Sequence, residues 1–198
     1  MARAAPQSSE SVTDAFTVNS FPLLQFDRKP IDKHLLSGFA IDWTDDLTLI
    51  HVIEDHTFHF NGYAVFRNTD VRRWRSVRKE EFLARAAQLH KLRPSKPPEV
   101  SIASMKEALT TAGAAFPVIT IHPERTRKGV CYVGKFARTT QRTLTLVDMS
   151  PTAEWGPEEN YLLRNITRLS FGGNYENLLV RMAKTPPRSS RPASRGSA

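Results

Sequence analysis

Apolar and polar residues alternate along several short runs before residue 80, with the period of two that is typical of half-buried β-strands. The run Gly38–Trp43 shows this alternation, and Asp45-Asp46 follows it as a turn. Asn61-Gly62 is the strongest hairpin signal in the chain. The predicted strands are Phe21–Phe26, Gly38–Trp43, Leu47–Ile53, Gly62–Phe66 and Val71–Trp74. Five short strands joined by tight turns predict a small β-barrel, because an open sheet of this size would leave unpaired edges.

Between residues 80 and 115 the apolar residues change to a helical period. Phe82, Ala86 and Leu89 fall on one face of a helix predicted over Glu80–Leu92. Ser104 and Glu107 have the spacing of a capping box, which predicts the start of a second helix. We therefore expect a helical linker here.

A second strand-rich region begins at Phe116-Pro117. Its predicted strands are Val118–His122, Val130–Phe136, Leu144–Met149, Tyr161–Leu163 and Ile166–Phe171, and a final helix is predicted over Tyr175–Lys184.

The two strand-rich regions share a pattern at a constant offset of 97 residues. In the first region, Phe39-Ala40 is followed after six residues by Leu47–Ile50, and in the second, Phe136-Ala137 is followed after six residues by Leu144–Val147. Each pattern leads to an Arg-Asn pair, Arg67-Asn68 and Arg164-Asn165. The repetition predicts an internal duplication.

The predicted fold class is mainly β (α+β), with two duplicated five-stranded barrels, each followed by a helix, and a helical linker between them. The expected divisions are a disordered N-terminus (1–16), a first barrel (17–79), the linker (80–115), a second barrel with its C-terminal helix (116–183) and a disordered basic tail (184–198).

This layout resembles the Sm-like and SH3-like small β-barrels, present in tandem over about residues 20–75 and 116–183. In that group a short turn separates the fourth and fifth strands, and 67–70 and 164–167 lie where that turn would be. The runs Ile119–His122, Cys131–Gly134 and Asn165–Tyr175 also resemble a family of uncharacterised bacterial proteins. The Sm resemblance implies RNA binding on the loops next to the Arg-Asn pairs.

The charge of the chain changes the functional expectation. The net charge is +8 and the isoelectric point is about 9.9. Residues 184–198 contribute +4 and residues 1–14 contribute −1, so residues 15–183 carry +5. A basic body can hold a polyanion through its phosphates. The chain contains a single cysteine and no long apolar run, so we expect a cytoplasmic protein without an internal disulfide or a membrane span.

The first functional hypothesis is a non-enzymatic nucleic-acid-binding module, for single-stranded RNA above all. Its candidate residues are Arg67, Arg72, Arg73, Trp74, Arg164 and Arg168, with the arginines on phosphate and an exposed aromatic ring stacking on a base. Trp74 has an alternative role in the packing between barrel and helix, as Leu169 would have in the second copy.

The second hypothesis is an SH3-like protein–protein interaction module. Such barrels bind peptides in grooves lined by aromatic residues. The aromatic candidates are Trp43, Tyr63, Trp155 and Tyr161.

Two clusters could support an enzyme or a metal site instead. His51, His56 and His59 lie close together with Glu54 and Asp55, but their odd separations place neighbouring ligands on opposite faces of a strand. His122, Glu124 and Cys131 could converge, yet the sequence offers no oxyanion site. We therefore expect no catalytic residue, no metal and no cofactor.

Overall fold

The computed structural model describes residues 15–185, and it confirms that the protein is mainly β. The predicted disorder of the two ends lies almost entirely outside these residues. The strands are β1 (Thr17–Val18), β2 (Phe21–Asp27), β3 (Leu35–Trp43), β4 (Leu47–Ile53), β5 (Phe60–Arg67), β6 (Arg73–Ser76), β7 (Ile119–His122), β8 (Tyr132–Thr139), β9 (Thr143–Met149), β10 (Trp155–Leu162) and β11 (Arg168–Phe171). The helices are α1 (Phe82–Leu89), α2 (Met105–Ala115) and α3 (Asn174–Met182), with 3₁₀ turns η2 (Asn68–Asp70) and η3 (Leu163–Asn165).

The strands form one open antiparallel sheet rather than two closed barrels. Its order is β1-β2-β3-β4-β5-β11-β7-β8-β9-β10, and β6 pairs with β2 beside this path. The expected closure into separate barrels is not found among residues 15–185. The physical reason lies in β11, which pairs with β7 on one side and with β5 on the other. This strand therefore joins the two halves of the sheet.

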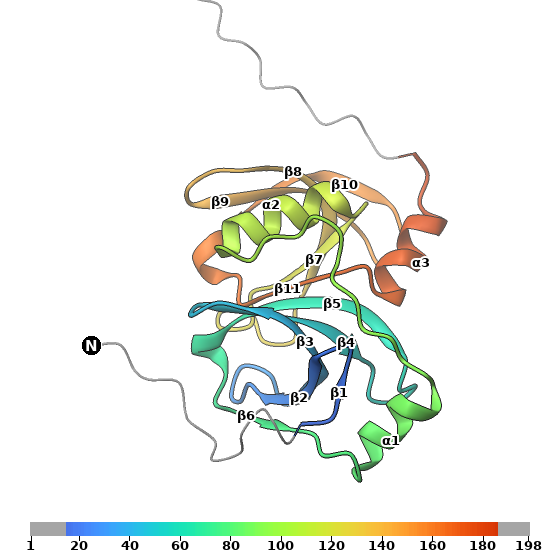
Figure 1. Cartoon of the computed structure of the whole chain (residues 1–198). Coiled ribbons are helices and arrows are strands. Elements are labelled where there is room, and N and C mark those ends of the chain that lie inside the picture. The colour runs from blue at the N-terminus through green and yellow to red at the C-terminus, as the bar shows by residue number, and fades with distance from the viewer. Residues whose placement is uncertain (1–14, 186–198) are drawn as a thin grey trace, which may run out of the picture.

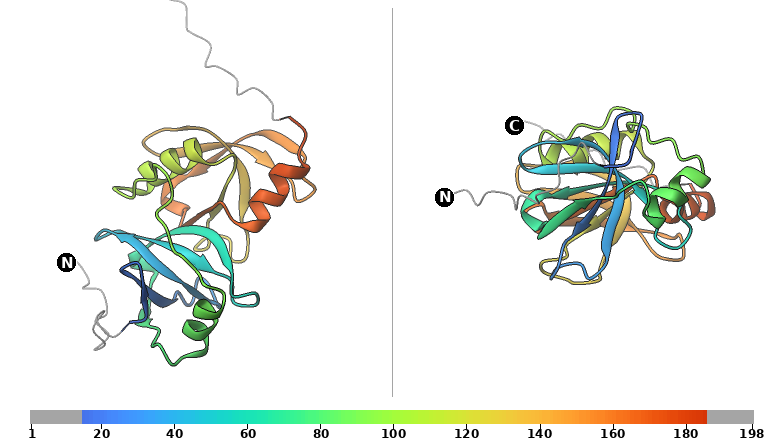
Figure 2. Two further views of the ribbon diagram at one scale, coloured as in Figure 1. Left: turned by 45° about the vertical axis from the view of Figure 1, so that its right-hand side comes forward. Right: turned by 60° about the horizontal axis from the view of Figure 1, so that its bottom comes forward.

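Each half nevertheless repeats the same order of elements. In the first half four strands, β2 to β5, are followed by η2 and by β6, which pairs back onto β2. In the second half β7 to β10 are followed by η3 and by β11, which pairs back onto β7. Figure 1 shows the two halves stacked, with β5 and β11 side by side between them, and Figure 2 shows the same arrangement from two further directions.

In the structure, equivalent residues of the two halves are separated by fewer residues than the offset of 97 found in the sequence, as the turns between β3 and β4 and between β8 and β9 show. In the β3–β4 turn the Thr44 N–H donates to Leu47 O at 2.8 Å, and in the β8–β9 turn the Thr140 N–H donates to Thr143 O at 2.8 Å. Leu47 is therefore equivalent to Thr143, and not to Leu144. Because side chains alternate between faces, a one-residue shift exchanges the two faces of a strand. The gap-free sequence match consequently aligns residues that are not structurally equivalent.

The largest apolar core extends across both halves. It contains Leu23, Phe39 and Val65 of the first half and Ile119, Leu146 and Phe171 of the second, together with apolar residues of α1 and α2. The predicted apolar face of α1 is wrong for Phe82, which is 70% exposed, and for Leu89, which is 79% exposed, but Ala86 is buried together with Ala84 and Ala87. The sequence pattern missed this because small alanines pack against the sheet in place of the large residues.

The predicted hairpin at Asn61-Gly62 is also wrong. These residues lie inside β5, and the connection from β4 is made by residues 54–59. Asn61 instead reaches the second half, where its Oδ1 accepts a hydrogen bond from Asn174 N at 2.8 Å, at the start of α3. Over residues 15–185, none of the helices has the length and apolar character needed to cross a membrane.

Candidate functional site

An apolar groove opens on the first half of the sheet. Its cavity volume is about 360 Å³. Trp43 at one wall is 62% exposed, and Trp74 at another is half-buried. The lining residues are Pro22, Leu24, Phe26, Ala40, Trp43, Thr44, Asp45, Thr48, Asn68, Val71 and Trp74. The groove thus combines Trp74, a residue of the RNA hypothesis, with Trp43, a residue of the peptide hypothesis.

Strand alternation explains how these side chains reach one surface. Pro22, Leu24 and Phe26 are two residues apart on β2 and therefore point to the same face. Phe26 is paired with Trp74 across β2 and β6, and Trp43 is paired with Thr48 across β3 and β4.

Asn68 fixes the polar end of the groove. Its Oδ1 accepts a hydrogen bond from Thr48 Oγ1 at 2.7 Å, and its Nδ2 donates to Thr44 O at 2.8 Å and to Asp45 O at 3.1 Å. The amide of the first Arg-Asn pair is therefore used to hold η2 against the β3–β4 turn. The groove offers a ligand mainly aromatic and aliphatic surface, with the exposed Asp45 at its rim.

Arg67 is placed between the two halves of the molecule. Its Nε donates to Ile166 O at 3.0 Å and its Nη2 donates to Leu163 O at 3.2 Å, both in the second half. Burial lowers the pKa of Arg67 below its usual value, with the nearby Arg125 acting in the same direction. These contacts give Arg67 a structural role in the joint, which is the region where β5 of the first half pairs with β11 of the second, together with the residues around these two strands.

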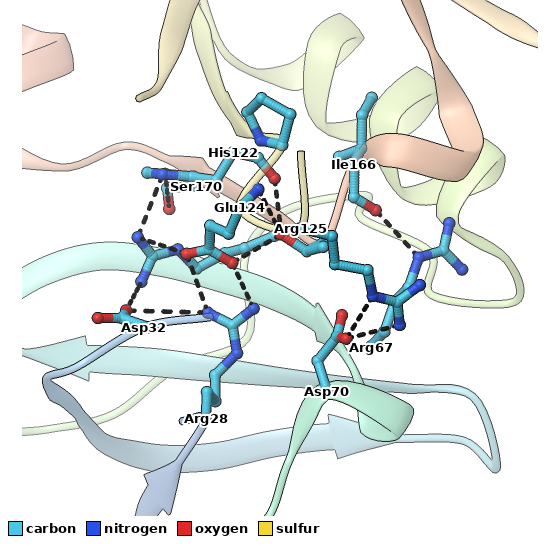
Figure 3. Close-up of polar contacts among 12 residues, drawn as sticks. Arg28, Asp32, Arg67, Asp70, His122, Glu124, Arg125, Ile166 and Ser170 are labelled. Atoms are coloured by element: carbon cyan, nitrogen blue, oxygen red, sulfur yellow. Dashed lines mark hydrogen bonds and ion pairs between the residues drawn. The ribbon is translucent and has the colours of Figure 1, made fainter. Parts of the chain in front are cut away.

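Arg168 belongs to a buried cluster of charged residues at the same joint. Its Nη1 lies 3.2 Å from Asp32 Oδ2, and its Nη2 lies 3.3 Å from Glu124 Oε1. Arg28, whose side chain is fully buried, places Nη2 2.6 Å from Glu124 Oε2. Figure 3 shows Arg28 of the first half meeting Glu124 of the second, and Asp32 of the first half beside the guanidinium of Arg28. With a side-chain exposure of 17%, Arg168 presents little of its guanidinium to an outside phosphate.

The remaining predicted arginines lie at the surface. Arg72 and Arg73 are exposed beside Trp74, and Arg73 Nε lies 3.1 Å from Asp27 Oδ2 while 74% of its side chain remains exposed. Arg164 is exposed on η3. The structure therefore keeps Arg72, Arg73 and Trp74 together and assigns Arg67 and Arg168 to the joint.

Of the four aromatic candidates for peptide binding, Trp43 lines the groove. The other three are held by hydrogen bonds elsewhere: Tyr63 Oη to Ser95 Oγ at 3.1 Å, Trp155 Nε1 to Lys184 O at 2.8 Å, and Tyr161 Oη to Asp148 Oδ2 at 2.6 Å.

The histidines of the first half do not gather around a common point. His51 stacks on Phe60 at 3.6 Å and on Tyr63 at 4.3 Å between ring centroids, whereas His59 contacts His90. Burial lowers the pKa of His51 to about 4. Among residues 15–185, no three His, Cys, Asp or Glu side chains are arranged to hold a metal ion.

The groups around His122 also serve the joint. Arg168 Nη2 lies 3.1 Å from His122 Nδ1 and can only donate, so Nδ1 accepts and the neutral ring carries its proton on Nε2, 3.3 Å from Ser170 Oγ. Burial, with Arg168 and Arg28 nearby, holds the pKa of His122 well below its usual value. Burial also raises the pKa of the Cys131 thiol. With Nε2 protonated, His122 donates to Ser170 Oγ rather than accepting from it, and the raised pKa of the Cys131 thiol, which lies at the surface, does not favour its thiolate form.

Sequence reasoning did not identify two sets of residues, the β2 face of the groove and the first-half members of the buried charged cluster. Leu24 and Phe26 could have been identified as a groove face, because they alternate along β2. Arg28 and Asp32 gave no signal, since they lie in a loop and their partners are 96 and 136 residues away along the chain.

Comparison of the chain with family models, curated proteins and solved structures found no match.

Proposed function

We propose that this protein is a non-enzymatic binding module, built from two SH3-like or Sm-like units, whose groove holds an extended proline-containing peptide. The observation that carries the proposal is the apolar groove walled by Trp43 and Trp74. The repeated order of four strands, a 3₁₀ turn and a fifth strand paired to the first supports the expected resemblance.

The chemistry of the groove favours a peptide. Proline-rich segments keep the polyproline II conformation before binding and lose little entropy when they dock on aromatic side chains. The amide of Asn68 is already engaged, so its contribution is to hold the groove's shape. The exposed Asp45 at the rim suits a basic residue of the ligand and disfavours a phosphate.

Single-stranded RNA is the second candidate, and a specific observation supports it. Arg72 directly precedes β6, and Arg73 and Trp74 begin it, with both arginines exposed and the indole in the groove. Such a combination can stack a base and hold its phosphate. It is weaker than the peptide proposal because Arg67 and Arg168 are engaged within the protein.

The test is fluorescence anisotropy with two labelled probes, an oligoproline of about ten residues that carries one arginine, and an oligouridylate of about ten nucleotides. Trp43→Ala should weaken peptide binding about tenfold or more, because it removes an exposed aromatic wall of the groove. Leu89→Ala, at a residue that is 79% exposed on α1, is the matched control and should leave binding unchanged.

The salt dependence separates the two candidates. Peptide binding in an aromatic groove should change little between 50 and 300 mM salt, whereas phosphate contacts should weaken steeply. Absence of peptide binding at millimolar concentration, or equal affinities of the wild type and Trp43→Ala, would overturn the peptide proposal. Tight, salt-sensitive binding of the oligouridylate alone would favour RNA.

A further inference from the structure

The joint between the two halves of the sheet is an asymmetric pairing of strands. β5 pairs with β11 in the register Phe66↔Arg168, Val65↔Leu169, Ala64↔Ser170 and Tyr63↔Phe171. The pairing continues one residue further, where the Arg67 N–H donates to Thr167 O at 3.2 Å. One half therefore contributes its fourth strand, and the other half contributes its fifth.

The strands equivalent to these two remain at open edges. The numbering of three elements in the first half differs by 95 residues from that of three elements in the second: β5 corresponds to β10, η2 to η3, and β6 to β11. β10 is therefore the second copy of β5, and β6 is the first copy of β11. Over residues 15–185, β10 pairs with β9 alone and β6 pairs with β2 alone. When unlike surfaces join two units, the same two surfaces stay open at the ends of the pair and can add further copies.

On both β10 and β6, backbone N–H and C=O groups point away from the neighbouring strand and are directed toward a further strand. The Leu163 N–H donates to Arg142 O on the β9 side, so the alternation of an antiparallel strand directs Glu158, Asn160 and Leu162 of β10 outward. The Val77 N–H donates to Leu23 O, so the same alternation directs Trp74 and Ser76 of β6 outward. These are the residues that the equivalent register would bring opposite one another.

The two edges carry opposite charges. Residues 154–162, which include β10, contain Glu154, Glu158 and Glu159 and no lysine or arginine. Residues 72–79, which include β6, contain Arg72, Arg73, Arg75, Arg78 and Lys79 and no acidic residue. In the register of the β5–β11 joint, Arg75 falls directly opposite Glu159, and Arg73 falls diagonally across from Glu159. Both arginines and Glu159 are exposed. Each arginine also contacts a carboxylate of its own chain, Arg75 at 2.8 Å from Glu81 and Arg73 at 3.1 Å from Asp27, and Glu158 lies 2.7 Å from Arg138, so pairing with a second copy would have Arg75 share its guanidinium between Glu81 and Glu159.

We propose that β6 of one molecule pairs with β10 of a second copy of this chain, repeating between molecules the joint that β11 and β5 make within one. Trp74 then faces Asn160, and Ser76 faces Glu158. A second copy is the partner that fits, because each chain carries both complementary edges. The proposal is independent of the peptide groove, although Trp74 contributes its backbone to one and its side chain to the other.

The first test is the molar mass of the full chain, measured by light scattering after size-exclusion chromatography at 10–100 µM and at two salt concentrations. We expect assemblies larger than the monomer that dissociate partly at high salt. Glu159→Arg and Arg75→Glu should each shift the population to monomer, because each places like charges opposite one another. The combined charge swap should restore assembly, and Asp55→Arg, at an exposed turn residue, should leave it unchanged.

The second test checks the register by cross-linking. In a Cys131→Ala background, a chain with Arg75→Cys is mixed with a chain that carries Glu159→Cys. These positions form a non-hydrogen-bonded pair, whose Cα atoms lie about 4.5 Å apart in antiparallel sheets. This separation is within the range of about 4.4–6.8 Å that disulfides span, so a disulfide should link the two chains on mild oxidation. Replacing Glu159→Cys by Asp55→Cys should abolish the link. A monomer at all concentrations, or no difference between these two cross-linking mixtures, would overturn the proposal.

Discussion

At the scale of single residues, the charges buried in the joint are matched to partners far away in the sequence. Arg28 is fully buried and lies over the ring of Phe66 at 5.6 Å, while Glu124 is bonded by Arg28 and by Thr167 Oγ1 at 2.6 Å. A buried ion pair adds little net stability, but leaving one member without the other costs several kcal/mol. The cluster therefore makes the correct alignment of the two halves strongly preferred over others.

His51 illustrates the same cost of burial without a charged partner. It lies between the rings of Phe60 and Tyr63, and its Nδ1 accepts from Ser95 N at 3.4 Å. Protonation would place a charge among these rings, and burial lowers the pKa of His51 from 6.5 to about 4. In this interval the unfolded chain binds the proton and the folded chain does not, so stability falls as the pH falls.

We predict that His51 removes about 2 kcal/mol of stability between pH 7 and pH 5. His51→Phe keeps a ring in the stack and should lose this part of the pH dependence, whereas His56→Phe, at an exposed position, should retain it. Urea unfolding at both pH values measures the difference. Parallel pH profiles for the wild type and His51→Phe would contradict the assignment. Comparing variants is necessary because His122 also stays neutral on burial.

At the scale of secondary-structure elements, alternation located the strands but not their pairing. The strands near Gly38–Trp43 and Leu47–Ile53 were predicted correctly from the alternation in the first and the β-rich composition of the second, and both prove to be buried on both faces over much of their length. The duplication was recognised through a match that is one residue out of register, since Leu47 is equivalent to Thr143. The groove and the joint could not be predicted, because both depend on contacts between segments that are distant in the sequence. Arg72, Arg73 and Trp74 lie together because they are consecutive, and their part in RNA binding stays a prediction.

The dipeptide Asn61-Gly62 is typical of a hairpin turn, but its glycine has a different purpose in this protein. The Gly62 φ of +68° is required within β5, and a Cβ there would lie 2.4 Å from both Gly173 N and Phe171 O. The glycine is thus needed because the backbones of β5 and of the β11–α3 connection approach closely. A turn-like dipeptide in the sequence marks a contact between halves.

Gly62→Ala should therefore destabilise the protein by about 3 kcal/mol or more, since it adds a backbone clash to the cost of a positive φ. Gly129→Ala is a matched control, because Gly129 also has a positive φ, +71°, but a Cβ there would meet nothing within 4 Å. It should cost about 1–2 kcal/mol. The measurement is the free energy of unfolding in urea. Equal losses for the two variants would show that close packing around Gly62 does not matter.

At the scale of the whole molecule, the two halves are expected to fold as one cooperative unit. The largest core contains residues of both halves, β5 and β11 share a hydrogen-bonded ladder, and Arg28 has its carboxylate partner in the other half. Separation would expose this core, unpair two strands and leave Arg28 without Glu124. These costs exceed what either half can recover alone, because small domains are only marginally stable.

The fragments 15–98 and 99–185 should therefore be unfolded when produced separately, and the full chain should unfold in a single transition. The tryptophans allow each half to be followed, since Trp43 and Trp74 lie in the first and Trp155 in the second. Trp155→Phe leaves a fluorescence signal from the first half, and the double variant Trp43→Phe, Trp74→Phe leaves one from the second. The fluorescence transition of each variant should coincide with its own circular dichroism transition, because a two-state molecule has one midpoint for every probe. A stable fragment, or a fluorescence midpoint displaced from the circular dichroism midpoint of the same variant, would mean that the shared core does not couple the halves.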